Sequence, residues 1–63
     1  MYEIILPGYC FRYDNKRLAY EVFEVLCTTY EHDARISLHK NGREIQYALI
    51  EKDKSDYKVV KVA

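Results

Sequence analysis

The residue types that could perform chemistry are few and widely spaced in this chain of 63 residues. His32 and His39 are not spaced with Cys10 or Cys27 in the way that zinc ligands usually are. No nucleophile has a general base beside it, and no pair of carboxylates marks a cleft. We therefore predict no metal site, no cofactor and no catalysis, so the protein is expected to act by binding.

The two cysteines are expected to be free thiols with structural roles. The chain starts at Met1 without a signal segment, which favours the cytoplasm, where thiols stay reduced. Cys27 falls on the apolar stripe of a predicted helix, where a free cysteine packs as a small hydrophobe. No apolar run reaches the roughly 20 residues needed to span a bilayer. We therefore expect a cytoplasmic protein without membrane contact.

Cations and aromatic residues alternate around Asp14, where the predicted helix is expected to start. Arg12, Lys16 and Arg17 are followed by Tyr20, and two of the cations lie at the positive end of the helix dipole. Each costs about 0.3–1 kcal/mol there when exposed. Such a local conflict can mark function, because cations and backbone N–H groups together bind phosphate or an acidic loop of a partner. The alternative is a solvated face that neighbouring acidic residues neutralise.

Seven tyrosines are present, which is a high number for so short a chain. Tyrosine combines a large apolar surface with a polar tip and is therefore favoured in binding surfaces. Packing in the core accounts for Tyr2, Tyr30 and Tyr47, which share the parity of buried positions. Tyr20 on the polar helix face and Tyr57 on the outer sheet face are interface candidates.

An apolar patch is predicted on the sheet face away from the helix. Ile50 and Val59 face each other there in the expected register, beside Tyr57. Such a patch favours a partner surface or a homodimer, although ordinary monomers also carry small apolar patches. The predicted partner-binding residues are therefore Arg12, Lys16, Arg17, Tyr20, Ile50, Tyr57 and Val59.

The alternative function is nucleic-acid binding through a basic β-hairpin. The residues for it are Arg35, His39, Lys40 and Arg43, since β-ribbons of this kind can enter a major groove. For His39 we favour an ordinary cross-strand pair with Glu44, which it faces in the expected register. Ten basic and ten acidic side chains cancel, so no global field attracts nucleic acid.

The hairpin itself is the clearest element of the sequence. Asn41-Gly42 predicts a two-residue type I′ turn between strands that run from about Ala34 to Lys52. The register that follows pairs Lys40 with Arg43, His39 with Glu44, Leu38 with Ile45, Ile36 with Tyr47 and Ala34 with Leu49. This register places one apolar set on a single face of the sheet.

An amphipathic helix is predicted before the hairpin. Asp14 is the expected N-cap, and the helix is expected to end near Tyr30. Apolar residues recur behind the cap at spacings of three and four, namely Leu18, Ala19, Val22, Phe23, Leu26, Cys27 and Tyr30.

Three further strands complete the prediction. The first runs from Tyr2 to the Pro7-Gly8 turn, residues 9–13 form a short second strand or an extended segment, and a polar turn at 53–56 leads to a last strand at 57–62. The last strand is expected to pair Lys52 with Tyr57, Leu49 with Val60 and Tyr47 with Val62. The whole chain, residues 1–63, is expected to be a single small α+β domain, a two-layer sandwich with one helix on a mostly antiparallel sheet of four to five strands in the order β(β)αβββ.

A chain of this size can bury only roughly 60% of its unfolded surface, so a partner or self-association would stabilise it. The leading hypothesis is therefore a small protein-interaction module, an adaptor or inhibitor that occupies the surface of another protein, with a homodimer as a further expectation. Compact chains of this size are common among accessory proteins of phages and mobile elements, which is a prior that no residue supports by itself.

Overall fold

One helix packs on a five-stranded antiparallel sheet, which confirms the predicted α+β class. The structure is a computed structural model that describes residues 1–52 and 57–62, so the turn predicted at 53–56 lies outside the described residues. The elements in chain order are β1 (Tyr2–Leu6), β2 (Tyr9–Tyr13), α1 (Lys16–Thr29), β3 (Ala34–Lys40), β4 (Arg43–Ile50) and β5 (Lys58–Lys61).

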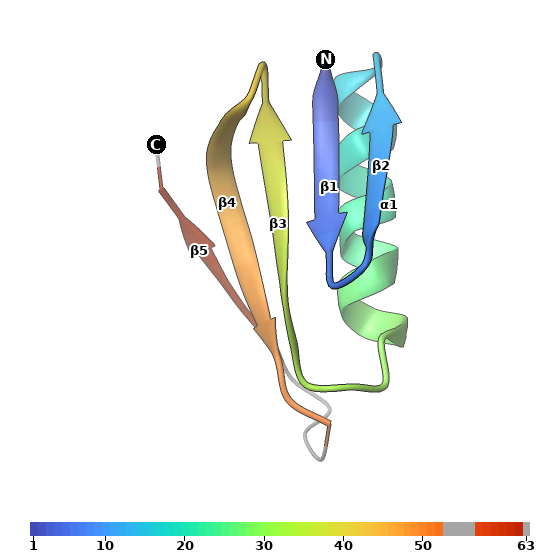
Figure 1. The fold of residues 1–63 in the computed structure, drawn as a ribbon, viewed down its shortest axis with the longest axis vertical. Coiled ribbons are helices and arrows are strands. Elements are labelled where there is room, and N and C mark those ends of the chain that lie inside the picture. Colours follow the sequence, from blue (N-terminus) through green and yellow to red (C-terminus); the bar gives the residue numbers. More distant parts are fainter. Residues whose placement is uncertain (53–56, 63) are drawn as a thin grey trace.

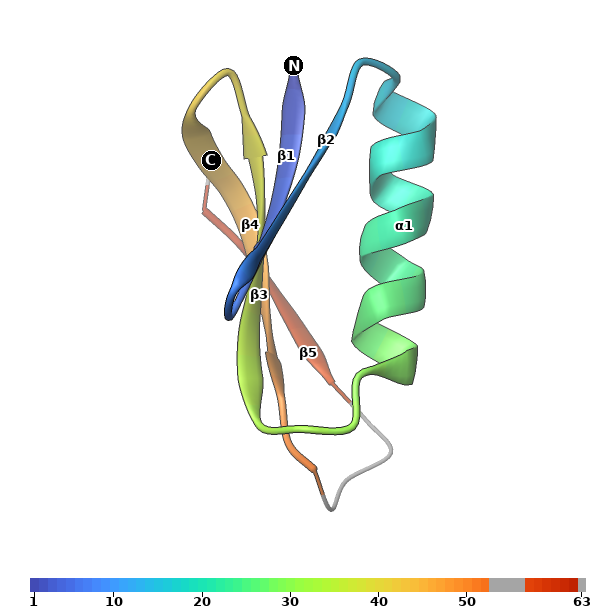
Figure 2. The same ribbon diagram turned by 45° about the vertical axis from the view of Figure 1, so that its right-hand side comes forward.

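The sheet has the strand order β2-β1-β3-β4-β5, so the first strand lies inside the sheet and the second forms an edge. β1 pairs with its hairpin partner β2 and, across a long stretch of sequence, with β3. Figure 1 shows these strands side by side with α1 behind them. In Figure 2 the sheet is seen closer to its edge, and α1 forms a second layer on one side only.

Helix α1 begins one residue later than expected. The side chain of Asn15 accepts a hydrogen bond from the backbone N–H of Leu18 at 3.1 Å and caps the helix, so the prediction of Asp14 as N-cap is wrong. Both residue types cap well, but here Asn15 has the extended backbone that the position requires. At the other end, the N–H of Tyr30 donates to the carbonyl of Leu26, which confirms an end near Tyr30. No helix in the described ranges is long and apolar enough to cross a membrane.

The core lies between α1 and the central strands. Ile4, Ile36 and Leu38 have no exposed surface, and the helix buries Phe23 and Cys27 against them. Burial on this scale is the main favourable term in folding, at about 25 cal/mol per Å² of apolar surface. Not all of the predicted apolar stripe takes part, because Leu18 is 45% exposed.

The turn of the β3–β4 hairpin is the one that the sequence predicts. Asn41 and Gly42 have φ values of 52° and 82°, as a type I′ turn requires, and Lys40 pairs with Arg43. The next pair, His39 with Glu44, is also confirmed.

Beyond that pair the predicted register is wrong, because a β-bulge follows between Leu38 and His39. The observed pairs are Leu38 with Gln46, Ile36 with Ala48 and Ala34 with Ile50. Ile45 is the extra residue on β4, and its carbonyl accepts a hydrogen bond from the N–H of Val62 at 3.0 Å. One inserted residue exchanges the two faces of a strand.

The bulge therefore turns the rest of β4 over. Ala48 and Ile50 are buried under the helix layer, while Tyr47 and Leu49 lie on the open face of the sheet. On that face the guanidinium of Arg35 lies 4.0 Å from the centre of the Tyr47 ring, which stabilises the new position of this tyrosine.

The pairing of β5 is also displaced from the prediction. Tyr47 pairs with Val60 and Leu49 pairs with Lys58, two residues earlier in β5 than expected. Ala48 pairs with Val59, so Val59 lies on the helix side of the sheet. The expected placement of Ile50, Tyr57 and Val59 on the outer face is wrong, since they follow the faces of β4 and β5 that the bulge turns inward.

Candidate functional site

A groove runs between α1 and the inner face of β4 and β5. One helix about 10 Å wide covers two or three strands that are spaced about 4.8 Å apart, and α1 packs on β1, β2 and β3. The inner face of β4 is buried, whereas that of β5, at the edge of the sheet, is only partly covered, and Val59 there is 38% exposed. The groove has a volume of about 650 Å³ and is lined by Lys16, Arg17, Tyr20, Glu21, Phe23, Glu24, Gln46, Tyr57 and Val59.

The floor of the groove is apolar. Phe23 is buried at its base, while Val59 is 38% exposed along the β5 side. Tyr57 is half-buried beside them, and this burial, together with nearby Cys27 and Glu24, raises the pKa of its phenol above the ordinary value. The floor can therefore take an apolar side chain of a bound segment.

A smaller hollow of about 330 Å³ shares Lys16, Tyr20 and Gln46 with the lining of the groove and carries three lysines. Lys16, Lys40 and Lys61 line it together with Tyr2, Tyr20, Ile45 and Gln46. The ammonium groups of Lys16 and Lys40 lie 6.0 Å from the Tyr20 ring and 5.8 Å from the Tyr2 ring, respectively. No carboxylate lines the hollow, and in the described ranges none forms an ion pair with these lysines.

Three different elements bring the lysines together. Lys16 is the first residue of α1, Lys40 precedes the Asn41-Gly42 turn, and Lys61 lies opposite Gln46. The first turn of α1 contains no acidic residue, so the positive end of its dipole adds to the charge of Lys16. The hollow is suited to a carboxylate or another anion.

Five of the seven predicted partner-binding residues line the groove: Lys16, Arg17, Tyr20, Tyr57 and Val59. The sequence assigned them to two separate surfaces, and the bulge in β4 is the reason that they share one. Tyr20, expected on the polar helix face, is half-buried and packs its ring edge against Tyr2 at 6.3 Å. Arg17 donates to Glu21 at 3.1 Å across one exposed helical turn.

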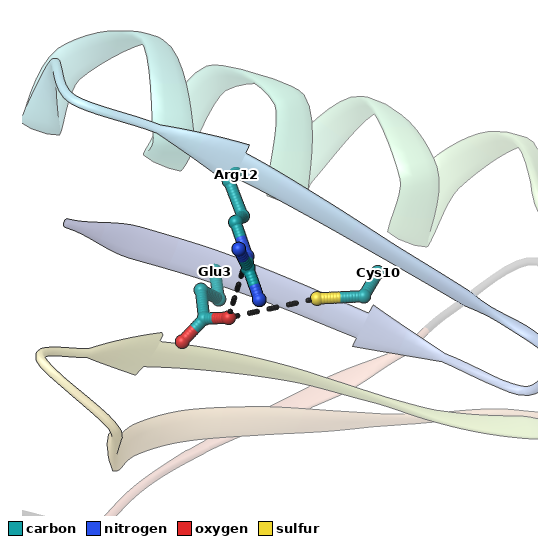
Figure 3. A network of polar contacts seen from close by, with 3 residues as sticks. All are labelled: Glu3, Cys10 and Arg12. Atoms are coloured by element: carbon teal, nitrogen blue, oxygen red, sulfur yellow. Dashed lines mark hydrogen bonds and ion pairs between the residues drawn. The ribbon is translucent and has the colours of Figure 1, made fainter.

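The other two predicted residues lie elsewhere. Ile50 is 6% exposed and belongs to the core, so its side chain is not part of a surface. Arg12 lies on the open face of the sheet, where its Nε donates to Glu3 at 3.1 Å. Figure 3 shows Arg12 and Cys10 directed toward the same carboxylate oxygen of Glu3, with the Cys10 thiol at 3.7 Å.

The four basic residues of the hairpin are not one surface. Arg35 and His39 lie on the open face, where Arg35 forms an ion pair of 2.7 Å with Glu44 and His39 hydrogen-bonds to Ser37 at 3.1 Å. The hydrogen bond lowers the pKa of the Glu44 carboxyl and raises that of the Arg35 guanidinium. Lys40 turns to the helix side and Arg43 remains at the tip, so the alternative function lacks a continuous basic stripe.

Sequence reasoning missed the part that Lys40 and Lys61 play in the groove. The sequence pattern places Lys40 in the basic hairpin, and it does not bring Lys40 and Lys61 together in the hollow. The signal for Lys61 is its parity with Val59, because alternate residues of a strand lie on one face.

The cysteines and histidines form no metal site in the part of the chain that the structure describes, where no group of three metal-ligating side chains occurs. Cys10 is exposed and Cys27 is buried, and both are free. Burial, with a smaller effect of Glu24, raises the pKa of the Cys27 thiol to about 11, so it stays protonated and unreactive.

The fold and the groove define an α+β protein with one helix on a five-stranded antiparallel sheet. In the comparisons with known proteins, no protein-family model, no curated protein and no solved structure matches this chain.

Proposed function

We propose that this protein is a non-catalytic interaction module that binds an extended segment of a partner protein in the groove between α1 and β4–β5. The segment would carry an apolar anchor side chain followed by carboxylates. The observation that carries the proposal is the continuity of an apolar floor with a hollow lined by Lys16, Lys40 and Lys61.

The apolar floor and the lysine-lined hollow contribute to binding in different ways. Phe23, Tyr57 and Val59 offer apolar surface, which stabilises a bound side chain of leucine or phenylalanine size by about 1.5–3 kcal/mol when it is fully buried. The lysines attract an acidic segment and fix its direction, which favours one orientation over the reverse. The tyrosines that line the groove, Tyr20 and Tyr57, provide rigid contact surface at a low entropic cost.

A cytoplasmic setting belongs to this proposal. It is supported by the exposed free thiol of Cys10, which persists best in a reducing compartment. An adaptor or an inhibitor role fits equally, since both need only a surface that a partner segment occupies.

The first test uses a defined probe. A ¹⁵N-labelled sample is titrated with a peptide that carries one leucine followed by three aspartates, and with a matched peptide in which lysines replace the aspartates. We expect amide shifts at Lys16, Tyr20, Phe23 and Val59 with the acidic peptide alone. Shifts on another surface, equal responses to both peptides, or no response at millimolar peptide would overturn the proposal.

Charge reversal at two positions tests whether binding depends on the lysines of the hollow or only on the overall charge of the protein. Lys16→Glu combined with Lys61→Glu is expected to abolish peptide binding, whereas Lys58→Glu on the open face of the same strand is expected to retain it. The far-UV spectrum of each variant reports whether the fold is kept.

The same variants identify a native partner in a lysate. A protein that survives nuclease treatment, binds wild type and Lys58→Glu, and is lost from the double variant would support the proposal. Captured material that disappears on nuclease treatment, with a steep salt dependence, would support nucleic-acid binding in its place.

A further inference from the structure

The β2 edge of the sheet lacks the proline and lysine that keep many edge strands from pairing with another chain, and its one charged side chain, Arg12, is paired with Glu3. β2 is an edge strand of five residues without proline or lysine, and Tyr9 and Phe11 are 66% and 39% exposed. At the opposite edge, β5 has only four residues and includes Lys58 and Lys61. Short edge strands and lysines discourage pairing with another chain, so the two edges differ in kind.

The helix flank above β2 is also apolar. At 100° per residue, Tyr20, Glu24 and Arg17 lie on the groove side of Phe23. The opposite flank contains Leu18, Val22 and Leu26, and Val25 follows it on the outward side of the helix. Leu18 and Val25 are 45% and 56% exposed. Figure 1 shows β2 at the sheet edge alongside α1, so the strand edge and this flank form one side of the molecule.

We propose that this side is a homodimer interface in which β2 pairs with β2 of a second copy and forms a continuous ten-stranded antiparallel sheet. The proposal is independent of the partner-binding groove, which lies on the other flank of α1.

The hairpin geometry selects the register of the pairing. Leu6 and Tyr9 flank the two-residue turn at Pro7-Gly8, and residues in that position form a hydrogen-bonded pair within the hairpin. Alternation then directs the backbone N–H and C=O groups of Cys10 and Arg12 to the free edge. A twofold axis at Phe11 places Cys10 opposite Arg12 of the second copy, so this hydrogen-bonded pair occurs twice across the interface by symmetry.

The side chains are compatible with this axis. The two Phe11 rings meet at the closest type of antiparallel pair, with Cα atoms about 4.5 Å apart, and Tyr9 faces Tyr13 on either side. On the open face no like charges lie directly opposite each other, because Arg12 meets Cys10 and keeps its own partner Glu3.

The helices are spaced suitably as well. α1 is centred on β1, so its axis and that of the second copy would be separated by three strand spacings, about 14 Å. That gap exceeds the 8–10 Å of direct helix contact, and the aromatic side chains of β2 with Leu18 and Val22 fill it. A standard interface removes about 800 Å² from each partner, and one long side of a molecule measuring 32 × 21 × 20 Å supplies an area of that order.

Sedimentation equilibrium over a concentration series tests the proposal. We expect a reversible change from 7.6 kDa to twice that mass, with a dissociation constant in the micromolar range that is typical of a small interface. The mass of a monomer at millimolar concentration would overturn the proposal.

Two pairs of matched variants localise the interface. Arg12→Pro and Arg12→Ala both remove the ion pair with Glu3, but only proline removes the edge N–H, so only Arg12→Pro is expected to be monomeric. Leu18→Lys on the flank beside β2 is expected to weaken the dimer by about tenfold or more, whereas Thr28→Lys on the other flank leaves it within about twofold. Far-UV spectra confirm folding, and a dimer that none of these variants weakens would show that the interface lies elsewhere.

Discussion

The helix-covered face of the sheet excludes water, whereas the open face of the same strands holds its side chains in polar pairs. Under the helix, Ile4, Ile36 and Leu38 have no exposed surface. On the other side, Arg12 pairs with Glu3 and Arg35 pairs with Glu44 above the Tyr47 ring. Apolar burial and exposed ion pairs differ several-fold in energy, so nearly all the stability of this fold is expected to come from one face.

The sharpest way to break this comparison is to make one substitution on each face. Ile36→Ala on the covered face is expected to lower the free energy of unfolding by about 2–5 kcal/mol, because it leaves a cavity. Ile5→Ala, at a position that is 39% exposed on the open face, is expected to cost about 1 kcal/mol or less. Urea unfolding followed by circular dichroism measures both. Equal losses would contradict the division between the faces, and Ile36→Val serves if the alanine variant does not fold.

The two faces can also be compared through the pH dependence of stability, because Cys27 lies on the covered face and Cys10 on the open face. Burial raises the pKa of Cys27 from 9.0 to about 11, so the folded chain keeps a proton that the unfolded chain releases. This stability is present below pH 9.0 and is lost as the pH rises toward 11, by about 2–3 kcal/mol at 1.36 kcal/mol per unit. Unfolding measured at both ends of that range should show a smaller loss in Cys27→Ala than in wild type.

The control for this measurement is Cys10→Ala. Its thiol is exposed on the open face, so the variant controls for the loss of a thiol outside the core. The raised pKa of Tyr57 contributes in the same direction in all three proteins, and because Cys27 is one cause of that shift, its removal in Cys27→Ala lowers this contribution as well. If Cys10→Ala showed the smaller loss of stability between the two pH values, and Cys27→Ala did not, the assignment of the pH dependence to Cys27 would be wrong.

The smallest effect is expected at the ion pair of Figure 3. The side chain of Arg12 is 70% exposed, and a pair of this kind contributes about 0–1 kcal/mol, which salt reduces further. A double-mutant cycle of Glu3→Gln and Arg12→Gln at low and high salt measures the coupling. A salt-independent coupling above about 2 kcal/mol would show that the open face carries a buried network.

The covered face was predictable from the sequence for α1, β1 and β3, because its signals there are local, whereas for β4 and β5 the prediction is wrong. Asn41-Gly42 specified a type I′ turn, and the spacing of Ala19, Phe23 and Cys27 specified a helix face. The cap was missed by one position, since Asp14 and Asn15 are both good N-cap residues and the sequence offers no means of choosing between them.

The bulge could not be predicted, and it decided where the candidate site lies. Ile45, Tyr47 and Leu49 form one apolar alternation in β4, and Ala48 with Ile50 forms the other. A regular ladder without a bulge would place the first set on the helix side of the sheet. In the structure the second set faces the helix. Tyr47 then packs against Arg35 on the open face, and the carbonyl of Ile45 accepts a hydrogen bond from the N–H of Val62. Both are contacts between residues distant in sequence, so the groove that unites Lys16 with Val59 was not visible from local patterns.

The pairing of β1 with β3 also bears on how fast the chain folds. The β1–β2 and β3–β4 hairpins each close over a turn of two residues, which is a rapid and local event. β1 meets β3 only when the whole stretch between Leu6 and Ile36, helix included, has been drawn into a loop, and the entropy of that closure is lost before the core repays it. We therefore expect the two hairpins to form early and their joining beneath α1 to be the rate-limiting step of folding.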